Sequence, residues 1–188
     1  MRNGKLFLAV IGVISVFVVG CSMLGDETEK ANAIIGKANE IITKNNTDSI
    51  KSSELFNELL GDGISEVSDI EKHKNENKAK FDGLIQLNDK IAQNYEEIAT
   101  MFDASARLKI SDVYREYLTL KSREFRIRAE AEKLVAPMVR KFLETKTMDD
   151  WNKETDKFNE KSSKLIAEAD ELGKRADKIA SDNPTLIK

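Results

Sequence analysis

Apolar residues recur every three or four positions along most of this chain, which is the spacing of helices that bury one face. The pattern is cleanest from Trp151 to Ile179, and two comparable runs extend from Val67 to Phe102 and from Val113 to Phe142. A fourth run lies between Ala31 and Ile42. The sequence therefore predicts an all-α protein, an elongated antiparallel helical bundle with three long coiled-coil-like helices and a shorter N-terminal helical part.

Short polar segments mark the expected ends of these helices. Asn45 to Asp48 is a turn signal, and the short amphipathic segment after it is closed by Gly61-Asp62-Gly63. Ser111 is a candidate N-cap, Thr147 to Asp150 resembles a capping box, and Ser181 to Pro184 stops the last helix. The short connections favour folding back within one chain over a parallel oligomeric coiled coil.

Several residues interrupt the apolar seams. Pro137 lies inside a helical pattern and predicts a kink or a break between Lys133 and Pro137, because proline removes a backbone donor and clashes with the preceding turn. Glu124 falls on a seam, with Arg128 one turn later as its expected ion-pair partner. Phe125 lies off the seam and predicts a contact with the first helix. Lys74 and Asn77 are expected to protrude beyond the bundle, whereas Asn88 is a polar seam residue.

The first twenty residues differ from the rest of the chain. Arg2 and Lys5 precede an almost purely apolar stretch from Leu6 to Val19, too short for a typical membrane-spanning helix and typical of a secretory signal. The stretch ends at Val18-Val19-Gly20-Cys21, which resembles the lipobox of bacterial lipoproteins, with Val18 in place of the more common Leu. Cys21 is the only cysteine, so an intramolecular disulfide is excluded.

The lipobox resemblance implies a cleaved signal peptide (residues 1–20) and an acylated Cys21. It also implies an exported protein, anchored by lipid in the cell membrane of a monoderm or on the periplasmic side of the outer membrane of a diderm. Residues 21–25 form a short tether, residues 26–181 one helical domain, and residues 182–188 a C-terminal tail. The helical body is also loosely similar in layout to small all-helical lipoproteins described as cell-wall-binding.

Composition narrows the function further. Charged residues make up 34% of the chain, which carries two prolines and a net charge of −3. High charge with few helix breakers describes long, solvated helices, and a mildly acidic chain argues against nucleic-acid binding. His73 is the only histidine and is expected to be a solvated surface residue. No metal-ligand set, phosphate loop or nucleophile motif is present, so we expect no cofactor, no metal and no enzyme activity.

One line of basic residues stands out on the helix after Ser111. Arg115, Arg126, Lys133 and Arg140 fall within a narrow sector at 100° per residue, on the side roughly opposite the apolar seam, and Arg123 flanks that line. We define this basic ridge as Arg115, Arg123, Arg126, Lys133 and Arg140. It is a candidate surface for an anionic partner, although a solvated outer face is the ordinary explanation for such a line.

Together these patterns predict a non-enzymatic, lipid-anchored envelope protein. Its bundle would present a surface to a protein or to an anionic envelope polymer. Two alternatives stay open: a carrier for a small apolar ligand held inside the bundle, and an enzyme with an unrecognised carboxylate site. The sequence leaves the oligomeric state and the identity of the partner open.

Overall fold

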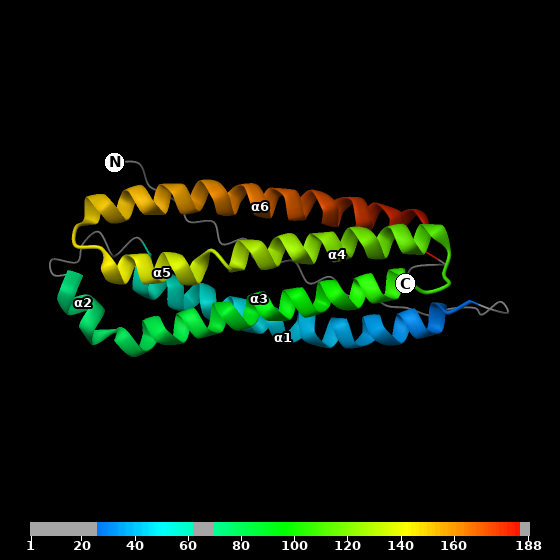
Figure 1. The fold of residues 1–188 in the computed structure, drawn as a ribbon, viewed down its shortest axis with the longest axis horizontal. Coiled ribbons are helices and arrows are strands. Elements are labelled where there is room, and N and C mark those ends of the chain that lie inside the picture. Colours follow the sequence, from blue (N-terminus) through cyan, green and yellow to red (C-terminus); the bar gives the residue numbers. More distant parts are fainter. Residues whose placement is uncertain (1–25, 62–69, 185–188) are drawn as a thin grey trace.

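The computed structural model describes residues 26–61 and 70–184. Four helical rods lie side by side in an elongated antiparallel bundle, which confirms the all-α prediction (Figure 1). The helices are α1 (Thr28–Leu60), α2 (Ile70–Glu76), α3 (Lys78–Ala106), α4 (Asp112–Glu132), α5 (Val135–Glu144) and α6 (Met148–Asp182). The longest, α6, extends about 50 Å at 1.5 Å per residue.

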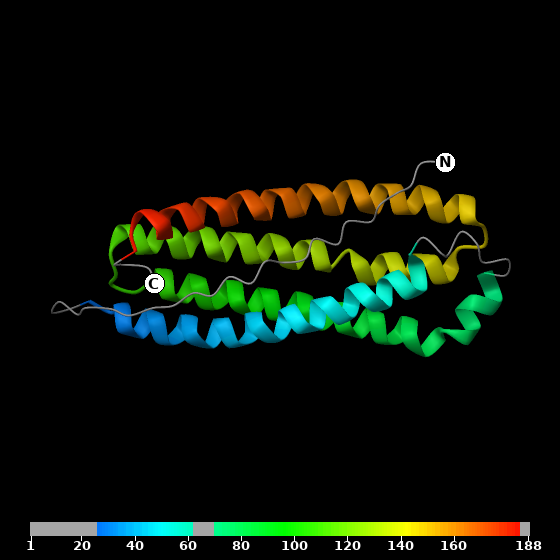
Figure 2. The same cartoon turned by 180° about the vertical axis from the view of Figure 1, so that it is seen from behind.

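The rods are arranged in an open order rather than in a closed ring. α1 packs against α3, α3 against α4, and α4 against α6, so that α1 and α6 lie at opposite edges (Figures 1 and 2). The rod that contains α4 is interrupted after Glu132, and α5 continues it in the same direction. α3 and α4 therefore form the centre of the bundle.

The N-terminal helical part is longer than the sequence pattern suggested. α1 runs unbroken through the expected turn at residues 45–48. Asn45 and Asp48 are buried there against α3: the Asn45 side chain donates to the Ile91 carbonyl at 3.3 Å, and Asp48 pairs with Lys90 at 2.6 Å. The turn prediction was wrong because these polar side chains bond across the interface instead of competing with their own backbone.

Three of the expected helix boundaries are confirmed. Ser111 Oγ accepts the Tyr114 backbone N–H at 3.2 Å, and Thr147 Oγ accepts that of Asp150 at 3.3 Å. Each cap satisfies an amide that has no partner within its helix. α6 ends at Asp182, as the stop signal predicted.

The middle rod breaks between α4 and α5, which confirms the expectation for Pro137. α4 ends at Glu132 and Pro137 lies in the first turn of α5, where its missing N–H costs no helical hydrogen bond. The break allows the chain to avoid a steric clash between the proline ring and the Lys133 carbonyl. α5 then directs Met138, Val139 and Phe142 into the core.

Two apolar clusters fill the bundle, one toward each end. The first lies nearer the α3–α4 turn and stacks Phe125 against Tyr95 and Phe102 of α3, with ring centroids 5.8 and 5.6 Å apart. The expected contact of Phe125 with the first helix stays a prediction, and its stacking on α3 is a contact that the pattern did not predict. The second cluster lies nearer the α5–α6 turn, where Phe142 packs edge-on against Trp151 at 4.9 Å.

Candidate functional site

The basic ridge is largely neutralised by α3. Arg126 pairs with Asp103, Lys133 with Glu96, and Arg140 with Asp89 at 3.7 Å. All six of these side chains are partly exposed and lie along the rim of the α3–α4/α5 interface. The ridge therefore flanks a helix interface rather than facing directly away from it.

The other two ridge residues have different surroundings. Arg115 pairs with Asp112, and its Nε and Nη2 atoms donate to the carbonyls of Ala106 and Ile110 at 3.1 and 3.2 Å. Arg123 is exposed and forms no ion pair with any described residue. Binding of an anionic partner by the ridge stays a prediction, but four of its five charges already have carboxylate partners.

A second set of charges lies inside the α4–α6 interface. Lys121 and Glu124 are each only 1% exposed and pair at 2.6 Å. Arg128 bridges Glu124 and Asp170, with 2.9 Å to each carboxylate. The expected Glu124–Arg128 pair is thus confirmed. We call these four residues the buried charge network.

A glycine on α6 makes room for this network. Gly173 lies so close to α4 that a Cβ atom there would be 3.2 Å from the Glu124 carboxylate. Ala169 and Ala176 are also fully buried on the same side of α6. Small residues bring the two helices close together, so the charges of Glu124 and Arg128 are shielded from water.

Next to the network, polar groups of α1 and α4 lie near the Tyr95 hydroxyl of α3. Burial raises the pKa of Tyr95 to about 12, an effect that the Glu132 charge increases and the Arg128 charge opposes. Ser49 and Asn45 of α1 lie close enough to affect this pKa, yet the Tyr95 and Ser49 hydroxyls complete no hydrogen bond of normal geometry. Burial also raises the pKa of Glu132 to about 7, with Arg128 offsetting part of the effect.

A carboxyl group that titrates near neutral pH beside a buried hydroxyl is one arrangement that general acid–base chemistry uses. The two other acids of this region are already engaged, because Glu124 and Asp170 both bind Arg128. Glu124 and Glu132 are about 12 Å apart along the axis of α4, at 1.5 Å per residue. Glu124, Asp170 and Glu132 therefore do not form a set of converging, unpaired carboxylates.

The end formed by α2, α5 and the end of α1 contains residues that sequence reasoning misplaced. Lys74 is 6% exposed, donates to the Thr145 carbonyl and lies over the Phe142 ring. His73 is partly buried between Phe81 and Phe142, and its Nε2 bonds the Leu59 carbonyl at 3.1 Å.

The expectations that His73 would be solvated and that Lys74 would protrude were therefore wrong. Asn77 does not extend beyond the bundle either, since it is partly buried at the junction of α2 and α3. The misleading signal was the strongly polar run EKHKNENK. It hid a short helix that folds back over the second apolar cluster and covers the end of α1.

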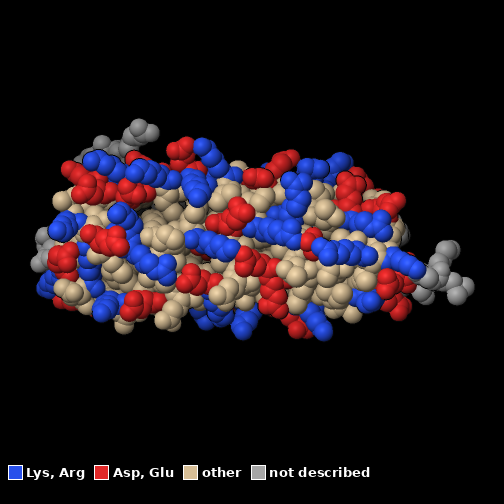
Figure 3. Space-filling model, in the orientation of Figure 1, with Lys and Arg blue, Asp and Glu red and all other residues tan. Residues whose placement is uncertain are grey.

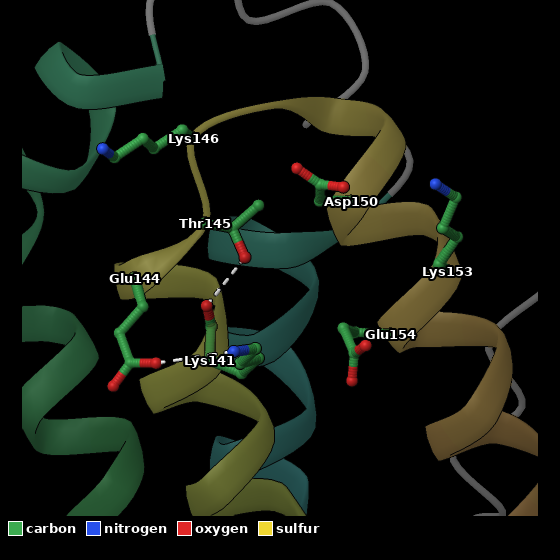
Figure 4. Close-up of a pocket in the computed structure, with 7 residues that line it drawn as sticks. All are labelled: Lys141, Glu144, Thr145, Lys146, Asp150, Lys153 and Glu154. Atoms are coloured by element: carbon green, nitrogen blue, oxygen red, sulfur yellow. Dashed lines mark hydrogen bonds and ion pairs between the residues drawn. The ribbon is translucent and has the colours of Figure 1, made fainter.

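A surface cavity of about 400 Å³ lies at the α5–α6 turn (Figure 4). Its lining is charged rather than apolar, and its three acids each have a partner: Glu144 with Lys141, Asp150 with Thr147, and Glu154 with Lys157. Lys146 and Lys153 point in different directions and do not converge on one point (Figure 4). The cavity lining is Lys141, Glu144, Thr145, Lys146, Asp150, Lys153 and Glu154.

The opposite end of the rod joins the start of α1 to the α3–α4 turn. The Asp26 carboxylate accepts the backbone N–H of Thr28, the first residue of α1, at 2.8 Å. Glu27 donates its backbone N–H to the Lys109 carbonyl at 2.7 Å, and its carboxylate accepts the Lys109 backbone N–H at 3.0 Å. This second hydrogen bond is the main reason that the pKa of Glu27 is lowered. Cys21 and the lipobox lie outside the described residues.

Within residues 26–61 and 70–184, no group of three or more His, Cys, Asp or Glu side chains could hold a metal ion. No helix in the same ranges combines the length and the apolar character needed to cross a membrane. No protein-family description, curated protein or solved structure matches this chain.

Proposed function

We propose that the protein is a lipid-anchored, non-enzymatic envelope protein whose helical rod presents a binding surface to another protein. The lipobox-like Val18 to Cys21 supplies the anchor. The observation that carries the proposal is the pair of Glu27–Lys109 hydrogen bonds, which ties the chain six residues after Cys21 to one end of the rod. The α5–α6 end would then extend up to about 50 Å from the membrane.

The anchor can be tested directly in cells. Cys21→Ala should abolish incorporation of a palmitate analogue and leave the signal peptide uncleaved, both of which mass spectrometry can read. Ser22→Ala is the matched control and should be acylated and cleaved like the wild type. Normal cleavage of the Cys21→Ala chain, with no acyl group on the wild type, would refute the proposal.

The charge distribution supports a protein partner over an anionic polymer. Acidic and basic side chains are interspersed over the visible face of the rod, and most of the ridge is paired with α3 (Figure 3). An anionic polymer would have to displace those carboxylates, whereas a protein can match a mixed surface pair by pair. Anionic-polymer binding is retained as the alternative for the ridge.

Photo-crosslinking in intact cells distinguishes these partners. We would place a probe at Arg123, which is exposed and forms no ion pair with a described residue, and a second at Lys161 on the exposed side of α6. The proposal expects a discrete adduct with one protein. Adducts with glycan or other polymer alone would favour the alternative, and no adduct at either position would count against a presented binding surface on this part of the rod.

Glu132 gives some support to the alternative of an enzyme, because its pKa of about 7 suits proton transfer. Purified protein can be screened against hydrolase and isomerase substrate panels, with Glu132→Gln as a matched variant that cannot titrate. Turnover by the wild type that Glu132→Gln loses would favour this alternative. Equal signals from both proteins would remove Glu132 from any catalytic role.

A further inference from the structure

The turn between α3 and α4 is braced from two sides. Arg115 holds it from α4 through the carbonyls of Ala106 and Ile110. Glu27 holds it from the start of α1 through both backbone polar groups of Lys109. The shape of the turn and its attachment to the chain entering α1 are thus fixed together.

Two basic side chains lie on the outside of this braced turn. Arg107 and Lys109 are exposed, and neither forms an ion pair with a described residue, although the Lys109 charge contributes to lowering the pKa of Glu27. Leu108 and Ile110 lie between and after them and pack inward on the first apolar cluster. The turn therefore places its apolar side chains in the core and its cations outward.

Most acids at this end are engaged by other groups. Asp26 accepts the Thr28 backbone N–H, Asp112 pairs with Arg115, and Asp182 pairs with Lys178 at 3.1 Å. Glu29, in the first turn of α1, has no ion pair among the described residues. The tip of the α3–α4 turn is thus basic even though the end as a whole carries charges of both signs.

We infer that Arg107 and Lys109 bind anionic phospholipid headgroups, so that the α3–α4 turn is a membrane-contact surface. The inference rests on the proposed function, because acylation at Cys21 brings the turn to a membrane. The six residues from Cys21 to Glu27 span at most about 20 Å when fully extended. A basic side chain held this close to an anionic leaflet is attracted to the lipid headgroups. The attraction decays over roughly 10 Å from the membrane surface.

The experiment uses the acylated protein reconstituted into vesicles of a neutral phospholipid or of that phospholipid with 30 mol% phosphatidylglycerol. An introduced Ala104→Cys, on the exposed side of the last turn of α3, carries a fluorophore, because the native Cys21 is blocked by acylation. Headgroup-labelled quencher lipids report how closely the turn approaches the bilayer. A fluorophore at Asn152→Cys, in the second turn of α6, reports the opposite end.

We expect stronger quenching at Ala104→Cys on the anionic vesicles than on the neutral ones, with little quenching at Asn152→Cys on either. Arg107→Glu with Lys109→Glu should return the quenching at Ala104→Cys to the level on neutral vesicles. The contact equilibrium should weaken by roughly fivefold for each cation lost, and more for reversal. The matched control, Lys146→Glu with Lys153→Glu at the α5–α6 end, should leave the quenching unchanged.

Equal quenching on the two kinds of vesicle, or no effect of reversing Arg107 and Lys109, would overturn the inference. Circular dichroism of each variant separates loss of contact from loss of fold. Failure of the proposed function has a separate readout. A wild-type chain without acyl groups on mass spectrometry refutes the lipid anchor. An acylated chain whose quenching does not depend on lipid charge refutes only the membrane-contact surface.

Discussion

The two faces of α4 use charge in opposite ways. Toward α3, aromatic rings fill the interior and the ion pairs Arg126–Asp103 and Lys133–Glu96 lie at the wet rim. Toward α6, small residues allow close approach and the ion pairs lie inside. Exposed ion pairs contribute little stability, whereas a buried charge must keep its partner. The same helix therefore has one interface that tolerates charge changes and one that does not.

The largest effect should come from Glu124→Ala. It leaves Lys121 and Arg128 without their shared carboxylate inside the α4–α6 interface. We expect a loss of about 3–5 kcal/mol in the free energy of unfolding, measured by urea denaturation followed by circular dichroism. Glu130→Ala, an exposed acid on the same helix, is the control and should change stability by less than about 0.5 kcal/mol. Similar losses for the two variants would show that the buried charge network is not special.

The pH dependence should give the next largest effect, through Glu132. Its pKa is about 7 in the folded protein against 4.5 ordinarily, so the folded state holds this proton where the unfolded state has lost it. The contribution of Glu132 is therefore full below about pH 4.5 and is lost as the pH rises to about 7. The wild type should lose at most about 3 kcal/mol relative to Glu132→Gln between these pH values. A difference between the two proteins that does not change with pH would contradict the raised pKa of Glu132.

A smaller effect is expected from Gly173→Val, which forces a side chain against the Glu124 carboxylate. We expect a loss of roughly 1–2 kcal/mol in a thermal or urea melt. Gly83→Val is the matched control, because a Cβ atom at that helical glycine would meet nothing within 4 Å. Its stability should stay within about 0.5 kcal/mol of the wild type. If both valine variants unfolded alike, close approach of α6 to α4 would not be the cause.

The smallest effects belong to the rim. A double-mutant cycle on Lys133 and Glu96 should give a coupling of about 0.2–1 kcal/mol, because both side chains are about half exposed. At 1 M salt the coupling should fall toward zero, since the Debye length is then only about 3 Å. A coupling that survives high salt would place this pair in a less solvated setting than its exposure indicates.

Periodicity was enough to predict the helices but not their partners. The seams identified most of each long helix, although they split α1 and missed α2 as a separate helix. The one-turn spacing of Glu124 and Arg128 identified their pair, because that signal is local. Asn45 and Asp48 suggested a turn because their side chains can bond their own backbone. Their actual partners lie on α3, more than 40 residues away, and no local pattern reveals such a contact.

The basic ridge shows the same limit for the candidate site. Its cations were visible on a helical projection, but the facing acids Asp89, Glu96 and Asp103 lie on another helix. The raised pKa of Glu132 also depends on burial that only the packed bundle creates. The brace formed by Arg115 could have been suspected only from knowing how the α3–α4 turn closes.

The acidic and basic rows at the α3 rim repeat every seven residues on both sides. Suppose that the rod of α4 and α5 slid along α3 by one such repeat. Lys133 would then face Asp103 and Arg140 would face Glu96, so all but one of the ion pairs could form again. The ion pairs of the rim therefore fit almost equally well in the native alignment and in one shifted by a repeat. They cannot by themselves select the native alignment. That choice must come from contacts that occur once between α3 and α4, such as the Ser122 hydroxyl bond to the Ala99 carbonyl and the hold of Arg115 on the α3–α4 turn.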